Sequence, residues 1–440
     1  MDISHKLLND VLKVSKKYPE DVFARGYLFT DSKPNYVPPH WIRLDAFGAS
    51  LYRDPRLEIV DISSSNVRII CLGIIVDARS PEKTNREVVE DLIGQLMLDE
   101  TKFLEALDWT NGRYVIIFSN DNGNIRVLTD ATGMRSVFYV EDGSMTFSSH
   151  AALAALNCRD GKVEQLSLVF KFGYPGRLTP YKNVYLLTPN TFLKLQEKTI
   201  ERFYPRGLLC EKDISTVGVE CTKLLSNSGD AFCRRYPVVM SLTAGLDSRF
   251  ILASLKKQYQ RINFFTYYRR DEVDTDLADI YIASKISEKL NLNHQIVDLN
   301  QVTVDDSYQL LCSLNTHYKH IRKVSKWYYN NFRNTDTLHI RSNISEIGRT
   351  FYSYRMGKLA PLDASALLRL YAGATLKEKM NEQAQLVEDY LKIKEDFIRT
   401  TSFETGAKYL DYRDLFYWEH RMGVWHSQVV AESDPGFESV

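Results

Sequence analysis

One segment near the middle of the chain constrains the fold more than any other. Residues 238–242 form an apolar run, Thr243, Ala244 and Gly245 follow, and a helical pattern extends over 247–257. A buried strand, a loop of small residues and a helix start, in this order, indicate an α/β unit. Backbone N–H groups of the loop and of the first helical turn point at one place, where they favour an anion. The segment therefore predicts a phosphate site.

Spacing alone also allows a simpler interpretation, in which Gly245 ends the strand and Asp247 caps the helix. A carboxylate at position 247 would repel a phosphate unless it holds a Mg²⁺ ion that also contacts the phosphate oxygens. The phosphate interpretation therefore includes magnesium, with Asp247 as its ligand.

Residues 238–249 resemble the PP-loop of the ATP pyrophosphatases, written S-G-G-x-D-S, and are most similar to its asparagine synthetase branch. Thr243 stands where Ser is usual and Ala244 where the first Gly is usual, so the hydroxyl is kept and one methyl is added. No Lys follows the glycine, which separates the segment from a Walker loop. The resemblance implies ATP and Mg²⁺ as cofactors, with nucleotide contacts from Leu242, Thr243, Ala244, Gly245, Asp247, Ser248, Arg249, Tyr267 and Ser342.

The same family carries S-G-E-G-S-D-E after a later strand, and the Asp of this motif is its second Mg²⁺ ligand. Residues 341–349 stand in that place: Ser342 matches the leading Ser, and Glu346 is the carboxylate near the expected position. Glu binds Mg²⁺ through oxygen as Asp does. The resemblance implies Asp247 and Glu346 as the catalytic, metal-holding pair. The alternative, Glu346 as a solvent-facing loop acid, stays open.

The first half of the chain reads as a hairpin-rich, sheet-dominated region. Its segments 107–115, 130–139 and 147–151 are similar in order and spacing to the glutamine amidotransferase domain of asparagine synthetases. Residues 173–180 and 202–204 fit the closing part of that domain. The resemblance implies a multi-domain α/β protein: an Ntn-type αββα sandwich over residues 1–205, then a PP-loop domain with a mostly parallel sheet over 206–440.

The nucleophile of the amidotransferase domain is missing from the sequence. That domain works through an N-terminal Cys, whereas this chain begins Met1-Asp2-Ile3 and its first cysteine is Cys71, inside an apolar run. A thiol in such a run is expected to be a small core residue. We expect the first half to be an inactive structural domain, as in the β-lactam synthetases and lasso-peptide cyclases of this family.

The end of the sequence departs from the family in another way. Residues 414–425 resemble the D-R-M helix beside the acceptor pocket, but a Pro-Phe element and a Lys-bearing segment normally come later. The chain is therefore expected either to dispense with that Lys, to be C-terminally truncated, or to be completed by a partner chain or in a homodimer.

Composition agrees with a cytoplasmic enzyme. Lys and Arg number 56, Asp and Glu number 56, and the formal net charge is +0, which implies no broad attraction to nucleic acid or anionic membranes. The six cysteines lack paired spacing, as expected of free thiols in a reducing compartment. No stretch reaches the roughly 18 apolar residues of a membrane span.

We therefore expect an ATP-dependent, AMP-forming amide-bond ligase that adenylates a small-molecule or peptide carboxylate and transfers it to an amine. The main alternative is a catalytically degenerate nucleotide-binding or scaffold homologue. A PP-loop enzyme acting on tRNA is disfavoured by the zero net charge and by the lack of Cys-x-x-Cys. Aspartate, a peptide and a sugar-linked acid all stay open as the substrate.

Overall fold

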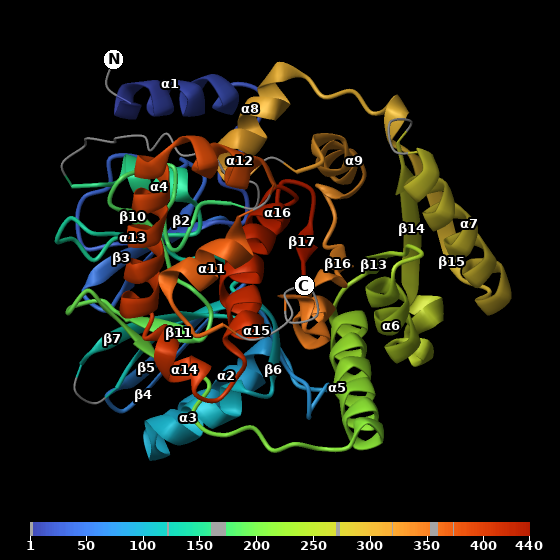
Figure 1. Cartoon of the computed structure of the whole chain (residues 1–440), viewed down its shortest axis with the longest axis horizontal. Coiled ribbons are helices and arrows are strands. Elements are labelled where there is room, and N and C mark those ends of the chain that lie inside the picture. The colour runs from blue at the N-terminus through green and yellow to red at the C-terminus, as the bar shows by residue number, and fades with distance from the viewer. Residues whose placement is uncertain are drawn as a thin grey trace.

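Three β-sheets organise the part of the chain that the structure describes (Figure 1). This computed structural model describes residues 3–120, 123–159, 173–269, 273–318, 320–352, 360–372 and 374–440. Two sheets are antiparallel with six strands each, and the third is parallel with five. The chain is therefore a mixed α/β protein with several sheets, as the sequence predicts.

The two antiparallel sheets are made from the first half of the chain. The first sheet has the order β10-β8-β9-β1-β3-β2, with strands β1 (Tyr27–Thr30), β2 (Ile42–Ala46), β3 (Ala49–Arg53), β8 (Phe138–Val140), β9 (Phe147–Ser148) and β10 (Val184–Leu186). The second sheet has the order β12-β11-β7-β6-β5-β4, with strands β4 (Ile59–Ser64), β5 (Val67–Asp77), β6 (Thr110–Ser119), β7 (Ile125–Thr129), β11 (Thr191–Lys194) and β12 (Thr199–Arg202).

Strand β5 shows why these sheets stack. Its side chains alternate between two cores: Ile70 and Leu72 pack between the two sheets, while Ile69 and Cys71 pack beneath helices. A strand that is buried on both faces is a continuous apolar run, as this segment is. Cys71 is 0% exposed, and burial raises the pKa of its thiol. The prediction that Cys71 is a core residue is confirmed, and all six cysteines are free thiols.

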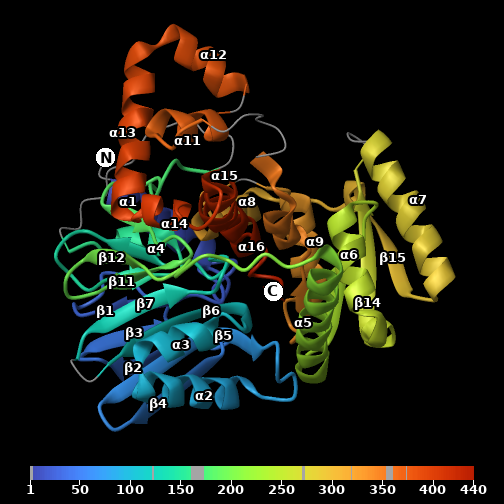
Figure 2. The same cartoon turned by 60° about the horizontal axis from the view of Figure 1, so that its bottom comes forward.

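Helices cover the outer faces of the stacked sheets (Figure 2). Helices α2 (Asn85–Leu98) and α3 (Glu100–Leu107) pack on the second sheet, and α1 (Ile3–Ser15) and α4 (Ala151–Leu156) pack on the first. A capping box starts α2, because the Thr84 side chain accepts from the Glu87 backbone and Glu87 accepts from the Thr84 backbone. The first half is thus a helix–sheet–sheet–helix stack.

The parallel sheet is made from the second half of the chain, in the order β15-β14-β13-β16-β17. Its strands are β13 (Val238–Ser241), β14 (Ile262–Tyr268), β15 (Asn293–Asp298), β16 (Leu338–Ile340) and β17 (Glu438–Ser439). Both faces are covered by helical elements, among them α5 (Ile214–Arg235), α6 (Leu246–Ser254), η1 (Lys256–Arg261), α7 (Val273–Leu290), η3 (Leu299–Gln301) and α9 (Arg322–Phe332). Helix α8 (Asp306–Asn315) packs instead with α1 in the core beneath the first sheet. In the sequence, apolar runs at 237–242, 262–268 and 338–341 predict strands, and β13, β14 and β16 confirm them to within a residue at each end.

The sequence has one continuous helical pattern over 365–398, which predicts a single helix, but the structure divides it. It comprises α11 (Ala364–Tyr371), α12 (Ala374–Glu382) and α13 (Ala384–Thr400), and Gln383 is extended between the last two, with φ −135° and ψ 93°. Apolar periodicity continues across such a break, so it could not be predicted from spacing. The chain then continues through α14 (Phe403–Ala407), α15 (Tyr412–Phe416), the π-helix η5 (Tyr417–His426) and α16 (Ser427–Ala431).

A buried charge network joins the C-terminal residues to the sandwich. The Arg113 guanidinium donates two hydrogen bonds to the Asp434 carboxylate, at 2.5 and 2.8 Å, and a third to Glu438 at 3.0 Å. Arg135 donates to the same Glu438 oxygen at 2.5 Å. These four side chains are between 1% and 9% exposed. The division into two domains near residue 205 stays a prediction, because residues beyond it pack back against the first half.

Replacement of Arg113 by Met tests how strongly this network stabilises the fold. Asp434 would be left buried without its bidentate partner, so we expect the free energy of unfolding to fall by about 3–5 kcal/mol. Urea denaturation followed by circular dichroism measures this. The control is Arg43→Met, because Arg43 and Asp45 form an exposed pair at 2.9 Å and should contribute about 0–1 kcal/mol. Equal effects of the two substitutions would contradict the expectation.

A second buried cation, Lys394 on α13, has no carboxylate partner among the described residues. Its side chain is 0% exposed and donates to Nε2 of His420 at 3.2 Å, while the Gly176 N–H donates to the same nitrogen at 2.8 Å. Burial lowers the pKa of Lys394 well below its usual value. The amine is therefore neutral in the folded protein over a range of pH in which it is charged in the unfolded chain.

This depressed pKa predicts a pH dependence of stability. The contribution of the neutral amine is fully present above the unfolded-state pKa of about 10.4 and is lost as the pH falls towards the folded-state pKa. Lys394→Met should remove that slope and stabilise the protein at pH 7 by on the order of 1–3 kcal/mol, since Gly176 still satisfies His420. Urea unfolding between pH 7 and 10 tests this; a slope retained by Lys394→Met would contradict it.

Candidate functional site

The order of the parallel strands singles out one crevice. From β13 the chain moves to β14 and β15 on one side, and then to β16 and β17 on the other side. In open parallel sheets, ligands bind at the carboxyl ends of the strands where the order reverses, here between β13 and β16. Two segments leave the sheet at this place: the loop of residues 242–245, and residues 341–349, which include the 3₁₀ helix η4 (Asn343–Arg349).

The loop after β13 is shaped by its own side chains. The Thr243 hydroxyl lies 2.9 Å from the Ser248 hydroxyl and accepts from the Gly245 N–H at 3.1 Å. The Thr243 N–H donates to the Ser248 hydroxyl oxygen at 3.2 Å. Leu242 is buried and holds the loop to the sheet, since its N–H donates to the Phe265 carbonyl at 2.9 Å. The Thr243 hydroxyl, which corresponds to the usual Ser hydroxyl, therefore stabilises the loop through these contacts.

A carboxylate of this chain already accepts a hydrogen bond from one backbone amide of the loop. The Ala244 N–H donates to the Asp279 carboxylate of α7 at 2.7 Å. Burial raises the pKa of Asp279, and the bond from Ala244 opposes that shift. The loop amide is thus oriented to receive a negatively charged oxygen beside the first turn of α6. Asp279 was not among the predicted site residues, because nothing in its spacing relates it to the loop.

The two predicted metal ligands are brought together in the structure. Asp247 lies in the first turn of α6 and Glu346 lies in η4, and both carboxylates bond to Nη2 of Arg349, at 2.7 and 2.9 Å. The second oxygen of Asp247 accepts from the Ser345 hydroxyl at 2.9 Å. Arg349 stands where the two carboxylates converge, and its side chain is 43% exposed. The donor set fits Mg²⁺, which is commonly held by one or two carboxylates.

The convergence involves only two acids. The described residues contain no group of three or more His, Cys, Asp or Glu side chains suited to a metal ion. A magnesium ion at Asp247 and Glu346 would therefore need its other ligands from phosphate oxygens and water, as is usual for this ion.

The π-helix η5 contributes one tyrosine to the crevice. Tyr417, the first residue of η5, is 1% exposed and donates its hydroxyl to the second oxygen of Glu346. Burial raises the pKa of Tyr417, and the Glu346 carboxylate raises it further. Short π-helical stretches are often found at functional sites. Tyr417 was missed by the sequence analysis, because its distance from Glu346 along the chain carries no signal.

The remaining predicted residues lie around the same crevice. Ser342 precedes η4, and its carbonyl accepts from the Ser345 hydroxyl at 2.7 Å. Arg249 donates from Nε to the Gly245 carbonyl at 3.4 Å, so its guanidinium lies beside the loop. Tyr267 lies near the end of β14, two residues beyond the partner of Ser241, and burial raises the pKa of its phenol. The structure thus brings the predicted residues to one edge of the sheet.

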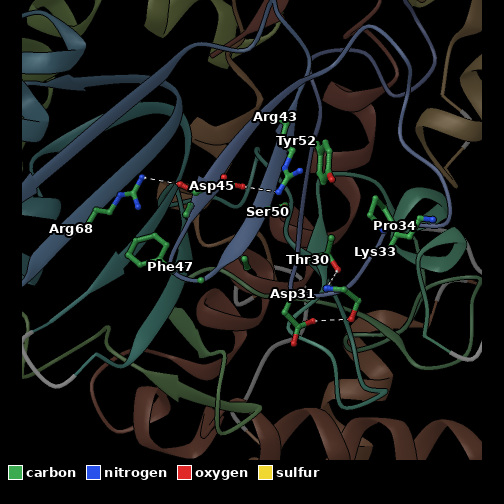
Figure 3. Close-up of a pocket in the computed structure, with 14 residues that line it drawn as sticks. Thr30, Asp31, Lys33, Pro34, Arg43, Asp45, Phe47, Ser50, Tyr52 and Arg68 are labelled. Carbon is green, nitrogen blue, oxygen red and sulfur yellow. Dashed lines mark hydrogen bonds and ion pairs between the residues drawn. The ribbon is translucent and has the colours of Figure 1, made fainter.

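A cavity of about 690 Å³ lies elsewhere, at the edge of the first antiparallel sheet (Figure 3). Among its charged side chains, Arg43 pairs with Asp45 at 2.9 Å and Arg68 pairs with Asp61 at 2.6 Å. The Arg68 guanidinium also lies 5.2 Å from the Phe47 ring centroid. Both arginines are already engaged, so volume alone does not make this cavity the candidate site.

Comparison with known proteins identifies no family. No protein-family model matches the chain. No curated protein matches it either. Among solved structures, it is similar to glutamine phosphoribosylpyrophosphate amidotransferase from B. subtilis, complexed with ADP and GMP, at 8% identity and a TM-score of 0.23. That match covers 78% of this chain and 74% of the other, and at this TM-score it supports no conclusion. None of the helices in the described ranges combines the length and apolarity needed to cross a bilayer.

Asp279→Asn tests whether the loop amide receives phosphate oxygens. Removal of a negative charge next to the loop should strengthen binding of inorganic pyrophosphate by about threefold to tenfold, from a Coulomb energy near 1 kcal/mol. Isothermal titration calorimetry measures the affinity. Glu288→Gln on the same helix is the control, because Glu288 is exposed and pairs with Lys285 at 3.1 Å. Weaker pyrophosphate binding in Asp279→Asn would show that the carboxylate supports the ligand instead of competing with it.

Proposed function

We propose that this protein is an ATP-dependent, AMP-forming carbon–nitrogen ligase of the asparagine synthetase family that lacks a glutaminase of its own. The observation that carries the proposal is the arrangement at the strand-order reversal. There an anion-accepting loop amide, the first turn of α6 and two converging carboxylates share one crevice.

In the proposed reaction, a carboxylate oxygen attacks the α-phosphorus of ATP and the bond to pyrophosphate breaks. An amine then attacks the acyl carbon, AMP leaves with the bonding electron pair, and the amine loses a proton. Thr243, Gly245 and Ser248 would hold the pyrophosphate, whose developing charge is stabilised by donors already fixed in place.

Asp247 and Glu346 would hold Mg²⁺, which supplies charge neutralisation at the phosphate oxygens. For this, the Arg349 guanidinium must leave the two carboxylates, and its exposure permits that movement. The backbone at Tyr267 would contact the adenine, and Leu242, Ala244, Arg249 and Ser342 would complete the nucleotide pocket.

The first half would be an Ntn-type αββα sandwich with a structural role. Its layer order fits that fold, and the buried Cys71 is not placed to act as a nucleophile. Without a glutaminase, the amine would come from the substrate itself, as in the β-lactam synthetases of the family that the sequence resembles.

One observation favours a second candidate, a nucleotide-binding scaffold without catalysis. Arg349 already forms an ion pair with both Asp247 and Glu346. A protein in which this pair persists would bind nucleotide without holding magnesium. Titration with ATP in the presence and absence of Mg²⁺ separates the two, because only the ligase should bind the magnesium complex more tightly.

The direct test is exchange of labelled pyrophosphate into ATP with a panel of carboxylic acids. Asp247→Ala should lower the exchange rate at least about 100-fold, as expected when a principal transition-state contact is lost. Asp306→Ala is a matched control, since Asp306 also lies in the first turn of a helix, α8, outside the crevice. Exchange that persists unchanged in Asp247→Ala would rule the proposal out.

A further inference from the structure

Four aromatic side chains line a small cavity where the second antiparallel sheet meets η5. The cavity has a volume of about 180 Å³. Tyr114 lies on β6, Phe203 and Tyr204 directly follow β12, and Trp418 is the second residue of η5. Among the described residues that line the cavity, Asp108, at the C-terminus of α3, is the one that carries a charge. Segments far apart in the sequence thus bring aromatic rings and one carboxylate to the same space.

The rings are held in fixed positions, yet three of them are not fully buried. The ring centroids of Tyr204 and Trp418 are 5.6 Å apart, and their planes are inclined by 59°. Nε1 of Trp418 donates to the Ala131 carbonyl at 2.6 Å, which fixes the indole. Phe203 stacks on Phe192 with a centroid distance of 6.1 Å. Phe203, Tyr204 and Trp418 are each only partly buried, whereas rings that serve packing alone are usually covered.

A cation of this chain already lies against one of these rings. The Arg206 guanidinium is 5.6 Å from the Tyr204 ring centroid, within the range of a cation–π contact. The same guanidinium forms an ion pair with Asp108 and donates to the Phe203 carbonyl at 3.3 Å. Arg206 does not line the cavity itself, so the space between the rings remains open beside it.

The charges around the cavity also favour a positive group. Burial raises the pKa of Asp108, the Arg206 guanidinium opposes this shift, and the Glu105 carboxylate adds to it. Two acids therefore face one cation on this wall. A second cation placed between the rings would be attracted both by their π faces and by the excess negative charge.

The walls and the volume restrict which cation fits. A primary ammonium has three N–H donors, and aromatic walls offer them no oxygen, so its burial is costly. A quaternary ammonium has no N–H donor to satisfy, and its methyl groups pack against ring faces. The volume is below the roughly 300–1,000 Å³ of pockets that enclose a drug-sized ligand, so the cavity suits a headgroup.

We propose that this cavity is an aromatic cage that binds a quaternary ammonium headgroup. Tyr204 and Trp418 form two inclined walls, Tyr114 and Phe203 complete the lining, and Asp108 is the counter-ion. Arg206 competes with the ligand for Asp108. The cage lies apart from the crevice of Asp247 and Glu346, and the proposal is independent of the ligase function.

Calorimetric titration of the full chain with choline and with 3,3-dimethylbutan-1-ol tests this. The two probes have the same shape, but the second carries carbon in place of the charged nitrogen. Choline should bind at least about tenfold more tightly, as expected of cation–π attraction in a partly desolvated site. Ethanolamine, the primary ammonium analogue, should bind more weakly than choline. A neutral isostere that binds as tightly as choline, or choline that does not bind, would overturn the inference.

Substitutions of the wall and the counter-ion provide the second arm. Tyr204→Leu should weaken choline binding about fivefold, and Tyr204→Phe, which keeps the ring, should retain most of the affinity. Asp108→Asn should weaken binding about fivefold, whereas Arg206→Met should strengthen it about threefold, because the competing cation is removed. These opposite signs at the two members of one ion pair are not expected if the pair only stabilises the fold.

Trp109→Leu is the matched control. Trp109 is 43% exposed, lies beneath the Arg79 guanidinium at 5.3 Å and does not line the cavity, so its loss should leave choline affinity unchanged. If Tyr204→Leu does not fold by circular dichroism, Asp108→Asn and Arg206→Met decide the outcome. Choline affinity that is unchanged in Asp108→Asn, or lowered in Arg206→Met, would contradict the assigned roles and overturn the inference.

Two sources carry this headgroup, a free solute such as choline and a phosphatidylcholine surface. Flotation with phosphatidylcholine vesicles, compared with phosphatidylglycerol vesicles, distinguishes them. Choline binding without flotation supports a soluble ligand, and flotation with phosphatidylcholine that free choline inhibits supports the lipid. Flotation with both lipids that choline does not inhibit, together with a flat choline titration, would show a non-specific surface and overturn the inference.

Discussion

The pairing of Arg113 and Arg135 with Asp434 and Glu438 holds the two halves of the molecule in one arrangement. Because Glu438 begins β17, and β17 pairs with β16, charges fixed on the sandwich determine where the edge of the parallel sheet lies. The Val440 carbonyl, two residues further on, accepts from the Arg341 N–H. The position of Arg341 at the carboxyl end of β16 is thus tied to buried arginines far away in the sequence.

This connection suggests why the first half would be kept although its cysteine is buried in a core. The sandwich supplies a rigid, apolar base, and it contributes Asn111 and Met134 to a cavity of about 200 Å³. Ser345, which bonds to Asp247, lines the same cavity. Removing the sandwich would expose this cavity and leave Asp434 and Glu438 without their guanidinium partners.

The candidate site satisfies most of its polar groups internally. Asp279 lies on the Ala244 amide, Ser248 and Thr243 bond to each other, and Arg349 pairs with both Asp247 and Glu346. A bound anion would exchange these contacts for similar ones at little net cost, since hydrogen bonds are replaced and not lost. By contrast, Nε of Arg341 and both ring nitrogens of His426 have no hydrogen-bond partner among the described residues.

Local pattern was sufficient for the strand, loop and helix from Val238 to Ser254 and for the buried strand that contains Cys71, because apolar periodicity is written in short stretches of residues. The pairing of Asp247 with Glu346 was implied by the family resemblance, and the structure brings the two side chains together at one edge of the sheet. The contacts of Asp279 and Tyr417, and the charge network of Arg113, join residues separated by tens to hundreds of positions. Such contacts depend on how folded elements pack against each other, and neither spacing nor composition records that packing.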